Sequence, residues 1–409
     1  VVPTAEVCST AADESCDGAG ECSGNGLWAR DLEGEEVTGS GAAVAADRWG
    51  NVLVTGYFDG AFEVSGLSLA SDVGAAFVMK LDSAGKGLWA RQTQGAAYGS
   101  AVGADADGNV IVAGSFHDGI DLGAGPLQSA GASDLFVAKY DPSGELLWSR
   151  QYGGPGYQWP EDMAVDAQGN VVLIGGLHDG ADFGDGYAPA AGETDFFVLK
   201  LDPSGKRLWS RQLGTTGYDY GLGIAVGSGG ALALTGSFEG TLDLGGGALV
   251  PAGSDDVFVA WLSPDGAHVW SQRHGGGGHD LGKAIAVGPS DTVVVAGLST
   301  GLIDLGTGPL SGGGDYDAFV AWYAKDGECL GAHVFGAPGA MAEALGVAAD
   351  SAGNVVVAGM VTGTVSFGGA ALTTVSIDWT HDLFVVKLDP AGQHVHSHLF
   401  GDEKQQLTA

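Results

Sequence analysis

Basic residues are scarce in this sequence, where sixteen Lys and Arg stand against fifty Asp and Glu for a formal net charge of −34 at pH 7. Such a surface repels nucleic acid and anionic lipid, so we expect neither as a partner. Apolar runs of the roughly twenty residues that a transmembrane helix needs are also missing. No basic segment followed by an apolar one opens the chain, so Val1 is interpreted as the start of a mature or trimmed product.

Cysteine is equally rare, with Cys8, Cys16 and Cys22 near the N-terminus and Cys329 alone. Their spacing does not contain the paired C-x-x-C of zinc sites. Disulfides formed in an oxidising compartment are the favoured interpretation, over a metal site or catalysis. Glycine, in contrast, is abundant at 74 residues but has no three-residue period, which excludes collagen and indicates many short strands joined by tight turns.

A unit of about 61 residues recurs along the chain. A Gly-Asn-Val signal marks four of the units, and two further positions replace its asparagine; they are Asn51, Asn109, Asn170, Ala231, Thr292 and Asn354. One tryptophan per unit keeps the same spacing, at Trp28, Trp89, Trp148, Trp209 and Trp270, and Gly331 and His396 take the next two places. The array runs without a composition break over residues 27–401. We therefore predict one repeat domain there, between a cysteine-containing segment (1–26) and a polar tail (402–409).

Each unit contains four predicted strands. In the second unit these strands, a to d, cover 101–105, 110–116, 135–140 and 145–151. The a–b turn contains Gly-Asn and the c–d turn reads Asp-Pro-Ser-Gly, two typical hairpin signals. A single four-stranded sheet cannot bury both of its faces, whereas consecutive sheets packed face to face can. The pattern thus favours an all-β chain, a β-propeller of four-stranded antiparallel blades, over a parallel β-helix.

The repeat resembles a known family. Its pattern A-V-x-x-D-x-x-G-N-V-x-V-x-G followed by F-V-x-K-L-D-P-S-G-x-x-L-W-S-R-x-x-G is similar to the bacterial SBBP (beta-propeller) repeat, and its rhythm is similar to that of NHL repeats. The resemblance implies a secreted or cell-surface protein and a propeller of seven blades. We count six complete units plus one spare d strand at 26–31, so six blades are predicted, with seven as the alternative.

The spare strand raises the question of how the ends of the array meet. We expect it either to add to the outer edge of the last blade or to replace that blade's own d strand, 393–400, which lacks the tryptophan. Cys329 begins the d strand of the fifth unit, next to this seam. A disulfide from Cys8, Cys16 or Cys22 to Cys329 would hold the start of the chain there.

Long, variable and polar connections are expected on one face of the blades, where strands b–c and d–a are joined, and loops on a rigid scaffold commonly carry function. The b–c connections contain acidic pairs, which are Asp118 with Asp121, Asp179 with Asp182, and Glu239 with Asp243. Two interpretations stay open for them. They could be oxygen ligands of Ca²⁺, the one cofactor suggested here, or they could cap turns by accepting backbone N–H groups.

The d–a connections are aromatic and acidic. Two interpretations stay open: a rim that binds sugars or a basic peptide, and tyrosines that only cover the ends of the blades. The candidate binding residues are Tyr98, Tyr157, Trp159, Glu161, Asp162, Tyr218, Asp219, Tyr220, His279, Asp280 and Glu343. A second candidate metal set is His394, His396 and His398, because alternate residues of a strand share a face. The repeated tryptophans are interpreted as packing between neighbouring sheets.

No catalytic motif such as G-x-S-x-G, H-E-x-x-H or a P-loop occurs, so binding is favoured over catalysis. The first hypothesis is a secreted or surface module that recognises a glycan or protein through the b–c and d–a face. The alternatives are a calcium-dependent hydrolase or lyase at the axial mouth, and a structural component of an extracellular or envelope assembly that contacts its own copies.

Overall fold

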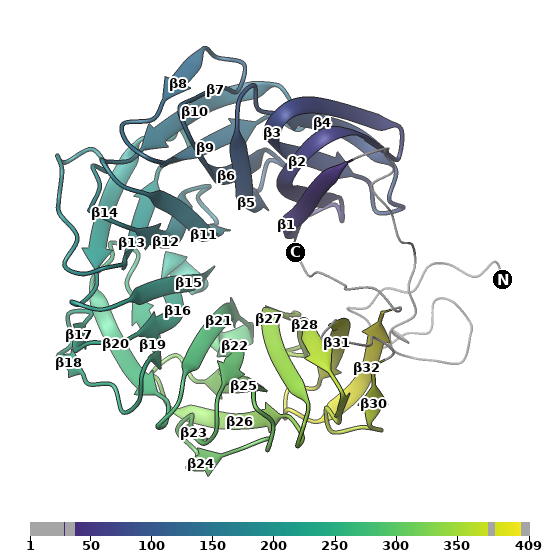
Figure 1. Ribbon diagram of the computed structural model, residues 1–409, viewed down its shortest axis with the longest axis vertical. Helices are drawn as coiled ribbons and strands as arrows, with labels where there is room; N and C mark the ends of the chain where they lie inside the picture. The colour runs from purple at the N-terminus through teal and green to yellow at the C-terminus, as the bar shows by residue number, and fades with distance from the viewer. Residues whose placement is uncertain (1–27, 29–36, 375–380, 402–409) are drawn as a thin grey trace. The chain divides into compact units, whose positions relative to one another are not determined.

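The computed structural model describes residue 28 and residues 37–374 and 381–401. Within them the chain forms six four-stranded antiparallel sheets and almost no helix, which confirms the predicted β-propeller fold with six blades (Figure 1). The blades belong to two compact units, one at Trp28–Gly275 with four blades and one that includes Gly276–Leu407 with two. No helix in the described ranges has the length and apolar character to span a membrane.

The unit Trp28–Gly275 contains the first four blades. Their strands, in order of blade, are β1 (Thr38–Ala46), β2 (Val52–Val64), β3 (Leu67–Leu81) and β4 (Gly87–Gln92); β5 (Ala97–Ala104), β6 (Val110–Phe116), β9 (Asp134–Tyr140) and β10 (Leu146–Tyr152); β11 (Gln158–Val165), β12 (Val171–Leu177), β13 (Asp195–Leu201) and β14 (Arg207–Leu213); and β15 (Asp219–Val226), β16 (Leu232–Phe238), β19 (Asp256–Leu262) and β20 (His268–His274). Small hairpins extend from two b–c connections, β7 (Gly119–Asp121) with β8 (Pro126–Gln128) and β17 (Leu242–Asp243) with β18 (Ala248–Leu249), and a 3-10 turn, η1 (Ser228–Gly230), precedes β16.

The second unit contains the fifth and sixth blades. Their strands are β21 (Asp280–Val287), β22 (Val293–Ser299), β25 (Asp317–Tyr323) and β26 (Cys329–Phe335), then β27 (Met341–Ala349), β28 (Val355–Thr362), β31 (Asp382–Leu388) and β32 (His394–Phe400). The 3-10 turn η2 (Pro289–Asp291) and the hairpins β23 (Ile303–Asp304) with β24 (Pro309–Leu310) and β29 (Thr364–Val365) with β30 (Leu372–Thr373) complete it. Because β32 pairs with β31, the last blade keeps its own d strand, and the expectation that the spare N-terminal strand replaces it is wrong.

The predicted turns form for a clear local reason. Asp105 Oδ1 accepts the backbone N–H groups of Asp107 and Asn109 at 2.9 and 3.0 Å, and Asn109 Nδ2 donates to Oδ2 at 2.8 Å. Gly108 adopts a φ of 81°, a left-handed value that glycine tolerates best. The Asp-x-x-Gly-Asn signal therefore closes the a–b hairpin within five residues.

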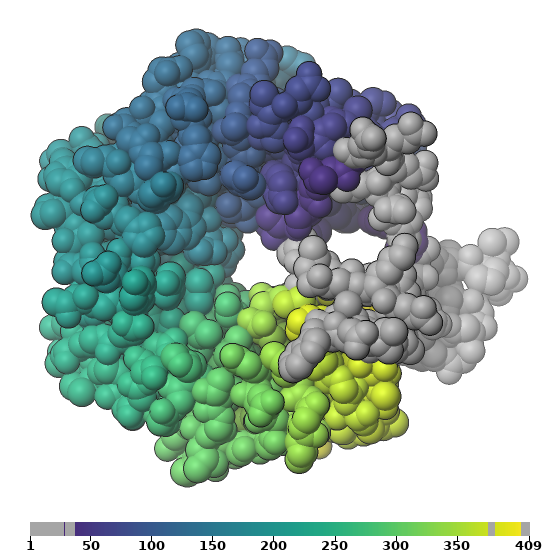
Figure 2. Space-filling view, in the orientation of Figure 1, coloured from purple at the N-terminus to yellow at the C-terminus, as the bar shows by residue number. Residues whose placement is uncertain are grey.

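Buried apolar residues from adjacent blades form the core. Leu135 and Val137 of the second blade pack with Leu173 and Phe197 of the third, and all four are completely buried. In Figure 2 the surface of the first four blades, purple to teal, continues from one blade to the next. Each sheet thus covers the face of the next, which is how a chain of strands without helices gains a core.

The repeated tryptophans join neighbouring blades, as the sequence predicts. Nε1 of Trp148 donates to the carbonyl oxygen of Pro203, in the c–d turn of the next blade, at 3.0 Å. Its ring also lies against Gly205, where a Cβ would come within 2.8 Å of the indole. Trp28 makes the equivalent contacts with the first blade, donating to the Ser83 carbonyl at 3.0 Å and lying against Gly85.

Candidate binding surface

The b–c and d–a connections lie on the same edge of the blades. Short backbone bridges join each of these b–c connections to a neighbouring d–a connection. Ser133 with Tyr157 and Thr194 with Tyr218 join it to the d–a connection that follows, and Gln94 with Asp121 and Gly153 with Asp182 join it to the one that precedes. The a–b and c–d hairpins lie on the opposite edge, where Gly169 faces Pro203. The edge with the longer connections is therefore a continuous structure built from neighbouring blades.

In the unit Trp28–Gly275 the first strands of the blades, β1, β5, β11 and β15, lie side by side (Figure 1). Aromatic residues stand where three of these strands begin, and we call them with their acidic neighbours the aromatic edge. It consists of Tyr98, Tyr157, Trp159, Tyr218 and Tyr220 with Glu161 and Glu239.

Three tyrosines of the aromatic edge are open to solvent. Tyr98, Tyr157 and Tyr218 are 47%, 51% and 44% exposed. Tyr98 is supported by the ring of Tyr57 at 4.9 Å between centroids. All three rings are therefore accessible, and that of Tyr98 is held from one side.

Trp159 is held by two polar neighbours. Its Nε1 donates to Glu161 Oε1 at 2.7 Å, and its ring lies 5.2 Å from that of His178. His178 also contacts Tyr157 edge-on at 6.2 Å. Sequence reasoning missed His178 and Tyr57. The residue that follows the b strand is polar in four blades, where it is His117, His178, Glu239 and Thr300. An alignment of the repeats at this position would have indicated His178.

Asp162 is a half-buried acid whose carboxylate contacts both the third and fourth blades. Its Oδ2 accepts the Ile224 N–H at 2.8 Å and its Oδ1 accepts the Met163 N–H at 2.7 Å. Burial raises the pKa of Asp162 to about 6, against the effect of these hydrogen bonds, and the charge of Glu161 adds to the rise. Asp162 therefore links two blades and changes its charge near neutral pH.

Several predicted binding residues are used inside the fold instead. Asp219 and Asp280 are completely buried and accept the N–H groups of Thr215 and Gly276, so their carboxylates are not accessible to a ligand. Glu343 is half-buried and pairs with Lys283 at 3.5 Å. His279 is exposed, and its backbone N–H donates to a threonine hydroxyl.

The acidic pairs of the b–c connections follow the turn-capping interpretation. Asp121 Oδ1 accepts the N–H groups of Gly123 and Gly125 at 2.7 and 3.2 Å. Asp182 and Asp243 repeat this arrangement with their own glycines. Glu239 accepts the Tyr218 N–H at 3.2 Å. The other two members, Asp118 and Asp179, are exposed and adopt left-handed φ values of 56° and 65°.

Metal ligands do not gather in the parts of the chain that the structure describes, where no group of three or more His, Cys, Asp or Glu is placed to hold an ion. Of the three predicted histidines, His394 bonds to Ser397 Oγ at 3.0 Å, and the rings of His396 and His398 lie 5.6 Å apart. Cys329 is half-buried and forms no disulfide with another described residue, and burial raises the pKa of its thiol. Cys8, Cys16 and Cys22 lie outside the described residues, so the disulfide stays a prediction.

Two known proteins are similar to parts of this chain. No family model matches the chain, so the SBBP resemblance is not confirmed. The regulatory protein FlaEY of Caulobacter vibrioides is 33% identical over 145 residues, which are 34% of this chain and 15% of that protein. An uncharacterized WD repeat-containing protein of Acanthamoeba polyphaga mimivirus is 24% identical over 249 residues, 49% of this chain and 18% of that protein. The chain thus spans less than a fifth of either relative.

The solved structures that match the chain are distant from it in both sequence and structure. The WD40 domain of Neurospora crassa Pan2 is 10% identical, with a TM-score of 0.39 over 78% of this chain and 86% of that one. A gluconolactonase of Xanthomonas campestris is 15% identical, with a TM-score of 0.35 over 81% of this chain and 97% of that one.

Proposed function

We propose that this chain is an interaction module that binds a protein partner through the aromatic edge. The observation that carries the proposal is the exposure of Tyr98, Tyr157 and Tyr218, beside carboxylates, where three neighbouring strands begin. Tyrosine and tryptophan are enriched in protein interfaces because a rigid ring buries a large area and loses little conformational entropy.

Charge favours a basic partner. The chain has a formal net charge of −34, and Glu161 and Glu239 lie among the exposed rings. Arginine and lysine side chains stack on tyrosine and tryptophan faces while they pair with nearby carboxylates. A basic segment would also be steered towards the acidic surface, which raises its association rate at low ionic strength.

The proposed setting is outside the cell or on its surface. The four cysteines, interpreted as disulfide partners, and the acidic composition support this location. Cell fractionation with an antibody against the native chain tests it, and recovery of the chain in the soluble cytoplasm would contradict it.

A binding screen tests the proposed surface. The probes are an array of peptides rich in Arg and Lys and an array of neutral glycans, and the variant is Tyr98→Ala/Tyr157→Ala/Tyr218→Ala. The control is Trp49→Ala, which removes a 56% exposed ring from the a–b turn of the first blade, on the opposite edge. We expect basic peptides to bind the wild type and the control, and to bind the triple variant at least tenfold more weakly.

Two other outcomes contradict this version of the function. Retention of glycans but not peptides, with the same dependence on the three tyrosines, would make the surface a glycan site. Equal peptide binding by the triple variant would remove the aromatic edge from the function altogether. If the wild type binds basic peptides as proposed, added salt should weaken that binding, because salt screens the attraction between the acidic groups and the peptide.

A further inference from the structure

A tryptophan is replaced by glycine at one junction between blades. Trp89, Trp148 and Trp209 each donate from Nε1 to a proline carbonyl in the next blade, with distances of 3.0, 3.0 and 3.2 Å. Gly331 occupies the same register in the fifth blade, because it pairs with Trp322 as Trp148 pairs with Lys139. The matching carbonyl belongs to Pro390 of the sixth blade.

The polar groups of this junction lack the partners that their equivalents have. Pro203 accepts hydrogen bonds from both Trp148 Nε1 and Lys139 Nζ. Pro390 accepts neither kind of bond among the described residues, because glycine and tryptophan stand at those two positions. Trp322 is only 6% exposed, and its Nε1 is buried with no hydrogen-bond partner in the described ranges.

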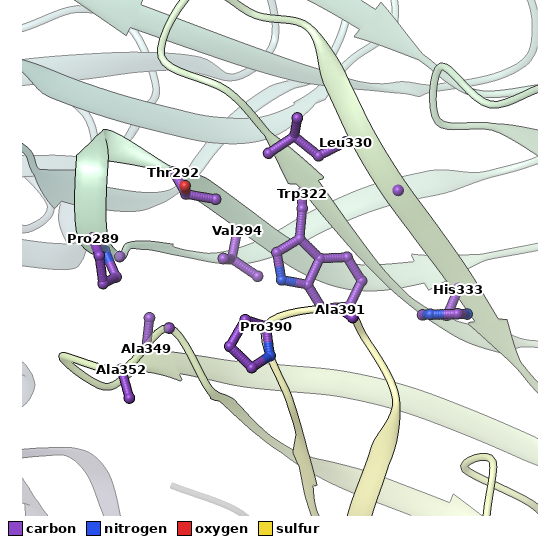
Figure 3. A pocket seen from close by; sticks show the side chains of 13 residues that line it. Pro289, Thr292, Val294, Trp322, Leu330, His333, Ala349, Ala352, Pro390 and Ala391 are labelled. Carbon is purple, nitrogen blue, oxygen red and sulfur yellow. The ribbon is translucent and has the colours of Figure 1, made fainter. Parts of the chain in front are cut away.

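A cavity of about 260 Å³ lies beside Gly331, the position at which the first four blades have the tryptophan ring. Its walls include Pro289, Thr292, Trp322, Gly331, Ala349 and Pro390, all within the unit that holds the fifth and sixth blades. Figure 3 shows the Trp322 ring beside Val294 and Pro390, with Ala349 and Ala352 beyond Pro390. The lining is mostly apolar, and Leu330, 57% exposed, stands beside it.

The cavity is formed in advance. The His333 ring lies edge-on to Trp322 at 5.7 Å and stacks with Phe335 at 5.9 Å, which holds the indole in place. His333 also lies over Gly392, the glycine that corresponds to Gly205 beneath Trp148. It therefore fills part of the vacated space, and the rest stays open between the a–b and c–d turns of the two blades.

We propose that this cavity binds a small planar heteroaromatic molecule of the indole class, with a ring N–H that donates to the carbonyl of Pro390. A preformed apolar cavity of about 150 Å³ is enough for benzene, so this one has room for a two-ring molecule. It lies below the range of roughly 300–1,000 Å³ typical of drug-sized ligands, which excludes larger ones. The neighbouring junctions supply the precedent, since they hold an indole by the same hydrogen bond.

Binding of indole tests the proposal. Titration of 5-fluoroindole, followed by fluorine NMR, should show one saturable site on the wild-type chain. Gly331→Trp places the chain's own indole in the cavity, and no atom lies within 4 Å of the position a Cβ would take at Gly331. We expect this variant to bind 5-fluoroindole at least tenfold more weakly. Ala349→Leu, which fills the facing wall, should have a similar effect and covers the case in which the first variant fails to fold.

Two controls make the result specific. 1-Methylindole has nearly the same shape without the N–H donor, and loss of one hydrogen bond should weaken its binding about fivefold. Leu147→Ala alters the equivalent of Leu330 in the second blade, where Trp148 is present, and should bind like the wild type. Unchanged binding in both cavity variants, or no binding by the wild type at millimolar indole, would overturn the proposal. The tyrosine variants of the aromatic edge should not affect it.

Discussion

Removing Asp105 should destabilise the second blade strongly. Its carboxylate lies 2.8 Å from Lys139 Nζ, and the two side chains are 6% and 5% exposed. Asp105 also accepts two backbone N–H groups and the Asn109 amide of its turn. Asp105→Ala therefore opens the hairpin and leaves a buried ammonium with only the Pro203 carbonyl at 3.4 Å. Breaking a buried pair from one side costs about 3–5 kcal/mol, and we expect that loss in the free energy of unfolding.

The measurement is urea unfolding followed by tryptophan fluorescence. Asp107→Ala is the matched control, because this exposed residue of the same turn contributes only its backbone N–H, and it should change the free energy by less than about 0.5 kcal/mol. A loss below about 1 kcal/mol for Asp105→Ala, with an unchanged denaturant slope, would refute the reasoning.

The fourth blade suggests how to rescue the variant. There the aspartate position is Gly227, the lysine position is Trp261, and Trp261 is 6% exposed. The fifth blade repeats the exchange with Gly288 and Trp322. The double variant Asp105→Gly/Lys139→Trp should therefore unfold at higher urea than Asp105→Ala, since no buried charge is left unpaired. Unfolding at the same or a lower urea concentration would show that the Gly–Trp pair cannot replace the Asp–Lys pair in the second blade.

Three further predictions concern other contacts. Trp148→Phe should lower the free energy of unfolding by about 1 kcal/mol through the lost hydrogen bond to Pro203, and Trp148→Ala by about 3–5 kcal/mol through the cavity, both measured by urea unfolding. The pKa of Asp162 is raised to about 6, so the folded state holds this proton more tightly than the unfolded chain does. The contribution of Asp162 to the free energy of unfolding is therefore full below about pH 4 and is lost as the pH rises through 6. Asp162→Ala should reduce this pH-dependent loss of stability, and an unaltered pH profile would contradict the prediction. Millimolar Ca²⁺ should leave the melting temperature unchanged, because Asp121 already accepts two backbone N–H groups, and a clear increase would restore the calcium interpretation.

Acid should destabilise the fold through the aspartates of the a–b turns. Burial alone would raise the pKa of Asp105, but the hydrogen bonds from Asn109 and Lys139 lower it by more, so this pKa lies below its ordinary value. Asp166 and Asp350 have the same arrangement and direction. A depressed pKa stabilises the folded state above the unfolded value near 4 and loses that effect as pH falls.

The strand order, the turns and the role of the tryptophans could be predicted from the sequence because their causes are local. A turn such as 105–109 is closed by hydrogen bonds within five residues. Apolar runs such as 110–116 and 134–140 mark strands that are buried on both faces, and the period of about 61 residues places each tryptophan against the next blade.

The candidate site was only partly predictable, because exposure depends on residues distant in sequence. Asp219 and Tyr218 are adjacent in the chain, yet one is completely buried and the other 44% exposed. Asp219 caps the d–a turn, whereas the Tyr218 side chain projects from a segment bridged to Thr194 of the previous blade. The sequence marks both residues as polar or aromatic and does not separate them.

The sequence by itself determined the repeat, the hairpins and the position of Gly331 in the tryptophan register, since each follows from neighbours along the chain. Only the tertiary structure decided whether the glycine at position 331 leaves a cavity. Whether a missing ring leaves a cavity depends on Pro390, 59 residues further along, and on how far Trp322 and His333 fill the space from the sides. Packing between blades sets that balance, because side chains close a gap only as far as their rotamers and their own contacts allow.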